Sequence, residues 1–206
     1  MNLLKVGAVS VASVGGIAGT VALVKNISTN KKVSVADKLK EEHFNLISSD
    51  SEWSAMLAKY NSKKSDSEAR FTAANVEVTL EDLKASCSKA LSEDSSTSQS
   101  YSKARRWCTV AKTLESHLIA SSFTLLNVNG SGDEDKEHWE KLQVAYEKSG
   151  RNSISNLTFS SSDKWKDLRT KCGEISKKET VEADFDTLFS NLKSWCTRQE
   201  ADKLVK

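Results

Sequence analysis

The chain has 206 residues, 38% of them hydrophobic, which suffices for one average domain or two small ones with a buried core. Its 30 basic and 28 acidic residues leave a net charge of +2, so the composition does not indicate nucleic acid as a partner. The sequence has no proline and 8 glycines. A chain of this length without the strongest helix breaker is expected to be all-α.

A charge-free segment, Val6 to Val24, lies between Lys5 and Lys25 near the start of the chain. As a helix its 24 − 6 + 1 = 19 residues reach about 28 Å, close to the thickness of a bilayer's hydrocarbon core. Residues 1–25 are therefore predicted to form a transmembrane or signal helix, followed by a polar linker over residues 26–33. A cleaved signal peptide stays open, although its apolar core is usually shorter.

The orientation of this helix is ambiguous. Lys25, Lys31 and Lys32 follow it, and the positive-inside rule then places the globular part in the cytoplasm. A signal or anchor with Lys5 inside the cell predicts the opposite, a globular part outside. Both topologies remain open at this point.

Helical spacing of apolar residues continues through the rest of the chain. Ser34 offers an N-cap with Asp37 three residues later, and Val35, Leu39 and Leu46 continue one helical stripe. Further stripes predict helices over about 50–60, 80–91 and 101–111. The polar segments between them are predicted loops.

The same landmarks then recur in the same order. Trp53 and Tyr60 are repeated by Trp139 and Tyr146, at an offset of 139 − 53 = 86 residues. The other repeated landmarks are Cys87 with Cys172, and Arg106-Trp107-Cys108-Thr109 with Ser194-Trp195-Cys196-Thr197. This recurrence predicts a tandem duplication, with one short-helix bundle over 34–108 and a second over 109–206.

The second bundle contains an acidic insertion. Thr109 to Leu114 match Ser34 to Leu39 at an offset of 109 − 34 = 75, so 86 − 75 = 11 extra residues are placed at about 126–136. Its polar residues follow the spacing of an EF-hand loop, namely Asn127, Asn129, Ser131, Asp133 and Asp135. His138 replaces the glutamate that such a loop needs. We therefore predict a dispensable surface loop without a metal.

The four cysteines lie on the apolar stripes of their predicted helices. A duplicated fold duplicates its contacts, so the expected disulfides are Cys87 with Cys108 and Cys172 with Cys196. Four buried thiols are the alternative, and spacing alone does not choose among the three pairings. Disulfides that persist require an oxidising compartment.

No catalytic or binding motif is evident. His43, His117 and His138 lack metal-ligand spacing, and the serines lack a nucleophile context. Arg105 and Arg106 directly precede Trp107, as in a nucleic-acid contact, but the second unit has Lys193 and Ser194 at these positions. The sequence therefore predicts no enzyme, no cofactor, no small-molecule substrate and no nucleic acid.

Three features together resemble a known group of proteins: the start M-N-L-L-K-V-G-A-V, the tandem Trp-Cys-Thr segments, and the Ser/Lys/Glu-rich helical body. This combination is similar to the uncharacterised paralogous, membrane-associated protein families of haemotropic mycoplasmas. The resemblance implies a surface protein that serves antigenic variation on cells living attached to erythrocytes. It implies no catalytic residue.

The leading hypothesis is a non-enzymatic, membrane-anchored surface protein of helical repeats, in the cell membrane with its globular part extracellular. Its expected role is host-cell adhesion or antigenic variation, with a host-cell surface or an antibody as partner. The alternative is a cytoplasm-facing, membrane-tethered scaffold with reduced cysteines.

Overall fold

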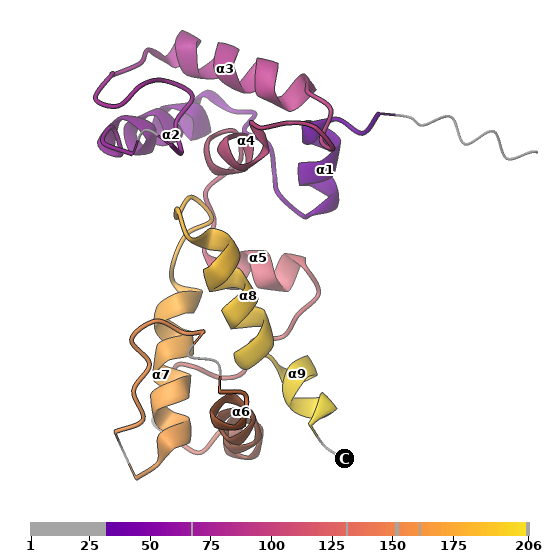
Figure 1. The fold of residues 1–206 in the computed structure, drawn as a ribbon, viewed down its shortest axis with the longest axis vertical. Helices are drawn as coiled ribbons and strands as arrows, with labels where there is room; N and C mark the ends of the chain where they lie inside the picture. The colour runs from indigo at the N-terminus through magenta and orange to yellow at the C-terminus, as the bar shows by residue number, and fades with distance from the viewer. Residues whose placement is uncertain (1–31, 67, 131, 151–152, 161, 205–206) are drawn as a thin grey trace, which may run out of the picture. The chain divides into compact units, whose positions relative to one another are not determined.

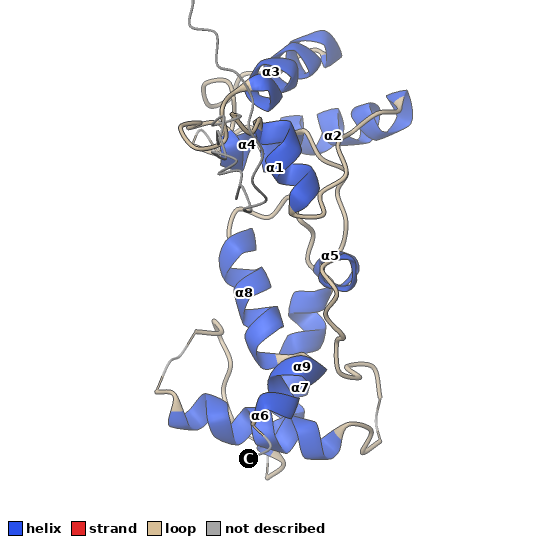
Figure 2. Cartoon of the chain, turned by 90° about the vertical axis from the view of Figure 1, so that its right-hand side faces the viewer, coloured by secondary structure: helices blue, strands red, loops and turns tan. Residues whose placement is uncertain are grey.

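The structure is a computed structural model that describes residues 32–66, 68–130, 132–150, 153–160 and 162–204. In these residues the chain forms nine α-helices joined by loops and no strand, which confirms the all-α prediction (Figures 1 and 2). The predicted anchor, Val6 to Val24, lies outside the described residues. None of the described helices is long and apolar enough to cross a membrane.

We divide the helices into two groups. The first set contains α1 (Val35–Glu41), α2 (Asp50–Ser62), α3 (Leu80–Ser92) and α4 (Tyr101–Trp107). The second set contains α5 (Leu114–Ala120), α6 (Lys136–Lys148), α7 (Lys164–Ser176), α8 (Phe185–Trp195) and α9 (Arg198–Lys203). The first three helices of each set have 7, 13 and 13 residues.

Side-chain caps start the first three helices of the first set. The Ser34 hydroxyl accepts a hydrogen bond from Asp37 N, as the sequence predicts for α1. Ser49 and Thr79 form full capping boxes with Glu52 and Asp82 at the starts of α2 and α3. These bonds satisfy backbone N–H groups that have no partner within the helix.

The first helix ends earlier than its apolar stripe predicts. His43 has φ 65° and turns the chain after α1, so the helix does not reach Leu46. Phe44 N then donates to Leu39 O at 2.9 Å, and Leu46 pairs with Thr109 in an isolated bridge. Leu46 therefore packs, partly buried, against a distant segment of the chain instead of extending α1.

The structure also corrects how the two halves align. Thr113, and not Thr109, caps α5 as Ser34 caps α1, an offset of 113 − 34 = 79 residues. Ser122 has φ 65° after α5, as His43 has after α1. The second set thus begins at Thr113, and the insertion before α6 amounts to 86 − 79 = 7 residues, not 11.

Buried apolar side chains of both sets form one continuous cluster. Helices contact one another within a set, as α1, α2 and α4 do with α3, and as α6 and α8 do with α7. The side chains that are nearly inaccessible to solvent come from both sets: Leu39, Tyr60, Leu83, Trp107, Leu118, Trp139, Leu142, Leu168 and Leu192. Burial of such side chains is the main term that stabilises short helices.

The acidic loop is docked onto the second set. Trp139 Nε1 donates to Asn127 O at 3.3 Å, and Arg169 on α7 donates to Gly132 O at 2.8 Å. Val128 lies against Gly173, where a Cβ would lie 3.4 Å from Val128 Cβ. The loop therefore has a structural role that its glycines and acidic residues do not indicate.

We expect replacement of residues 127–134 by one serine, as at Ser48 before α2, to destabilise the protein. The change removes the Asn127 and Gly132 hydrogen bonds and the Val128 contact, so the free energy of unfolding should fall by about 1–3 kcal/mol. Urea denaturation followed by circular dichroism measures this loss. Asp133→Ala, at an exposed position of the same loop, is the control. An unchanged free energy would restore the interpretation as a dispensable loop.

Candidate functional site: two disulfide-linked cores and the contact between them

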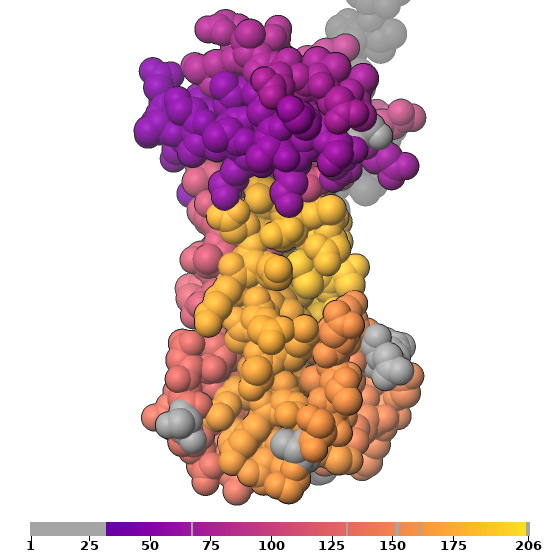
Figure 3. All heavy atoms as spheres, turned by 90° about the vertical axis from the view of Figure 1, so that its left-hand side faces the viewer, coloured from indigo at the N-terminus to yellow at the C-terminus, as the bar shows by residue number. Residues whose placement is uncertain are grey.

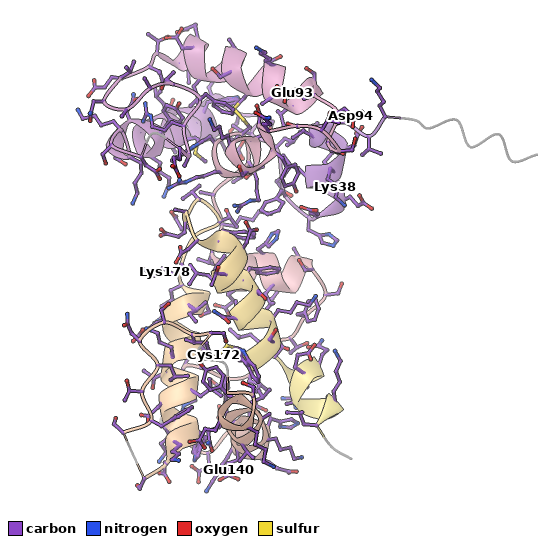
Figure 4. All side chains as sticks on the ribbon, in the orientation of Figure 1. Lys38, Glu93, Asp94, Glu140, Cys172 and Lys178 are labelled. Carbon is purple, nitrogen blue, oxygen red and sulfur yellow. A yellow bond between two sulfur atoms is a disulfide. The ribbon has the colours of Figure 1, made fainter. Side chains whose placement is uncertain are left out.

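All four cysteines of the chain are paired within their own set. Cys87 on α3 is bonded to Cys108 after α4, and Cys172 on α7 to Cys196 after α8 (Figure 4). The Cα–Cα distances are 5.5 and 5.8 Å, and every cysteine is at most 1% exposed. This is the pairing that the repeated landmarks predict.

Each residue of the repeated Trp-Cys-Thr segment has the same role in both sets. Cys108 and Cys196 form the disulfides, while Thr109 and Thr197 are fully buried and donate to the carbonyls of Arg105 and Lys193. The carbonyls of the two cysteines accept from Ile47 N at 3.1 Å and from Leu126 N at 3.0 Å. The segment therefore joins the end of the fourth helix of each set, α4 or α8, to the loop after the first helix, α1 or α5.

The tryptophan of the segment packs on a tyrosine from the second helix. The ring centroids of Tyr60 and Trp107 are 5.0 Å apart at an interplanar angle of 76°, and those of Tyr146 and Trp195 are 5.0 Å apart at 82°. Such edge-to-face pairs stabilise by about 0.5–1.5 kcal/mol beyond the area they bury. The two sets thus share an aromatic pair as well as a disulfide.

The same aromatic pairs hold the loop between the second and third helices. The Tyr60 hydroxyl accepts from Phe71 N at 3.0 Å, and the Tyr146 hydroxyl accepts from Ile154 N at 3.1 Å. In the first set this loop also carries Arg70, which is 1% exposed and donates to Val76 O. Its guanidinium lies 3.9 Å from the centre of the Tyr60 ring. No sequence pattern indicated a buried arginine here.

Figure 3 shows the first set, in indigo to magenta, in contact with the orange to yellow part of the second set. Two arginines at the end of α4 bind the second set. Arg106 Nε donates to Val181 O at 2.6 Å, and Arg105 donates to Thr180 O at 3.3 Å. Burial lowers the pKa of Arg105, although Asp186 lies 3.6 Å away on α8. Both side chains thus donate to backbone carbonyls of the second set.

Aromatic rings complete the contact between the sets. His117 on α5 stacks on Phe44 of the first set, with centroids 4.2 Å apart, and lies 4.9 Å from Phe189 on α8. The side chain of His117 is 3% exposed, and burial lowers its pKa to about 4. The spacing of residues in the sequence does not indicate the aromatic partners of this histidine, because they come from distant segments.

Each set also contains a small cleft at the same place. In the first set a cleft of about 250 Å³ lies between α3, α4 and the preceding loop, and in the second set a cleft of about 280 Å³ lies between α7, α8 and the equivalent loop. Glu93 and Lys178, at the carboxyl ends of α3 and α7, line them (Figure 4). The matching positions make these clefts the concave surfaces that the two sets have in common.

The two clefts differ in charge. The first contains Lys89 and Lys103, neither of which has an ion-pair partner among the described residues, while Glu93 accepts from Ser98 Oγ at 2.7 Å. In the second cleft Lys171 is paired with Glu174 at 2.7 Å. The first cleft can therefore accept an acidic group.

Two of the EF-hand-like residues, Asn127 and Asp135, are engaged within the protein. Burial opposes ionisation of Asp135, but hydrogen bonds from Asn127 N–H and Arg198 hold its pKa below the ordinary value. His138 lies 3.2 Å from Asp202 on α9. Three or more potential metal ligands do not cluster anywhere in the part of the chain that is described.

Removal of either disulfide should destabilise the protein by a similar amount. The bonds close segments of 21 and 24 residues, for which the loop-entropy model gives about 3 kcal/mol each. We expect Cys87→Ala/Cys108→Ala and Cys172→Ala/Cys196→Ala each to lower the free energy of unfolding by about that amount in urea denaturation. A loss below about 1 kcal/mol in either double variant would mean that the aromatic pair alone stabilises that set.

No protein-family model, curated protein or solved structure matches this chain. Its described residues offer two disulfide-linked cores, a contact between them and two matching clefts. These features are the basis for the function proposed below.

Proposed function

We propose that this chain is a non-enzymatic surface protein of two tandem helical repeats, held at the cell membrane with its globular part outside the cell. The observation that supports this best is the pair of buried disulfides at matching positions. Cytosolic thiols are kept reduced, so disulfides inside two small cores favour an oxidising compartment. The proposed anchor is Val6 to Val24, outside the described residues.

The proposed duplication accounts for the features that the two sets share. In both sets the first three helices have the same lengths in the same order. Both sets also contain a disulfide, a tyrosine–tryptophan pair and a cleft. Four independent features at matching positions are more simply explained by one repeated unit than by two unrelated bundles. In this interpretation the repeats serve as a stable framework for adhesion or for exposure to antibodies.

A cytoplasm-facing, membrane-tethered scaffold with reduced cysteines is the second candidate. Lys25, Lys31 and Lys32 favour it, because basic residues flanking a span tend to stay in the cytoplasm. The two candidates differ in the side of the membrane on which the cysteines lie.

A protease added to intact cells, together with peptide mapping of alkylated, unreduced protein, separates these candidates. We expect the globular part to be lost from intact cells, and the Cys87–Cys108 and Cys172–Cys196 peptides to remain linked. Full-length protein with its original N-terminus should enter the detergent phase. A protected globular part with four alkylated thiols would support the scaffold, and a new N-terminus after the apolar segment would indicate a cleaved signal.

We also propose the first cleft as the place where the surface partner binds, through an acidic group held by Lys89 and Lys103. Reversal of both charges, Lys89→Glu/Lys103→Glu, should weaken binding of the purified protein to erythrocytes by about tenfold or more. Lys171→Glu/Lys178→Glu makes the same charge change in the second cleft and should have little effect. Equal losses in the two variants would mean that net charge, and not the first cleft, determines binding.

A further inference from the structure

The ring of His117 lies where the two sets meet. Phe44 from the first set stacks on one face of it at 4.2 Å, and Phe185 and Phe189 on α8 lie at 5.6 and 4.9 Å. Its side chain is 3% exposed. The imidazole thus occupies the place of a core aromatic residue between segments that belong to different sets.

The surroundings of this ring favour the neutral imidazole over the protonated one. Nδ1 has no hydrogen-bond partner among the described residues, so a second N–H on a protonated ring would have no acceptor. The charged groups that act on the ring are Lys112 between α4 and α5, His43 after α1 and Arg105 on α4. All three are basic, and Asp186, the acidic residue at the start of α8, lies against Arg105 instead.

We propose that His117 is an acid-sensitive latch: its protonation separates the first set from the second while each set stays folded. Two observations favour separation over general unfolding. The helices pack within their own sets, and each disulfide joins two segments of one set. The contact between the sets depends instead on Phe44, on Arg105 and Arg106, and on the loop before α8.

Two opposing effects act on the protonated ring. The face of Phe44 attracts a cation, whereas loss of water and the nearby basic groups disfavour one. The second effect dominates, because burial first and then Lys112, His43 and Arg105 lower the pKa of His117 from 6.5 to about 4. The contact is therefore most stable above pH 6.5 and weakens as the pH falls from there toward 4.

The size of the effect follows from proton linkage. If the separated state returns His117 to its ordinary pKa of 6.5 and the closed state holds it at about 4, acidification from pH 8 to pH 5 raises the ratio of separated to closed molecules about 30-fold. Carboxylates such as Asp66, whose pKa is lowered by its hydrogen bond from Arg106, lose their contribution mainly at lower pH.

A thiol placed at the contact measures this separation. Val181 is 8% exposed, its carbonyl accepts from Arg106, and it lines a cavity of about 230 Å³ with Trp107 of the first set. In the full chain carrying Val181→Cys, dithiodipyridine forms a mixed disulfide with the new thiol and releases a thiopyridone that is read by absorbance. The native cysteines are all bonded and do not react. Val76→Cys, at a position 45% exposed, corrects for the pH dependence of the reagent.

We expect the corrected labelling rate at position 181 to rise about 30-fold from pH 8 to pH 5, with constant helical content by circular dichroism. In the His117→Phe background the rise should fall to less than about threefold, because a neutral ring then fills the site at every pH. His117→Leu carries the same expectation if the phenylalanine variant does not fold. An equal rise with and without His117, or a parallel loss of helical content, would overturn the proposal.

Discussion

The covalent bond between the third helix and the residue that ends the fourth is the constraint on which each set depends. Helices of 6 to 13 residues are unstable alone, and a set of four or five of them buries little surface. The disulfide holds Trp107 or Trp195 against its tyrosine, and the tyrosine then holds the loop before the third helix. Loss of the bond would release the tryptophan and the loop together.

The contact between the sets is of a different kind. It combines one aromatic stack with arginines that donate to backbone carbonyls, so much of its specificity is polar. The matching face of the first set is not aromatic: Lys38 occupies the place of His117 and is paired with Glu41 and Glu42, and Tyr101 donates to Glu42 (Figure 4). The two sets therefore share their cores but not the surfaces that they present to a neighbour.

The second set owes part of its stability to residues that the first lacks. The acidic loop covers Gly173 with Val128, and Asp135 at its end binds Arg198 at the start of α9. Helix α9 in turn packs against α6 and α8. Asp135, which the spacing of a calcium loop would assign to a metal, thus fixes a terminal helix instead.

The sequence by itself predicted the helical class and the recurring aromatic positions, and through the recurrence it favoured the pairing of the cysteines, because apolar spacing and recurring landmarks are local or periodic signals. Only the tertiary structure decided where Thr113 falls in the second set, how the acidic loop docks, and that His117, Arg105 and Arg106 lie between the sets. Those features depend on contacts between segments far apart in the chain. The local sequence around a polar side chain does not indicate whether that side chain will contact a carbonyl, an aromatic ring or water.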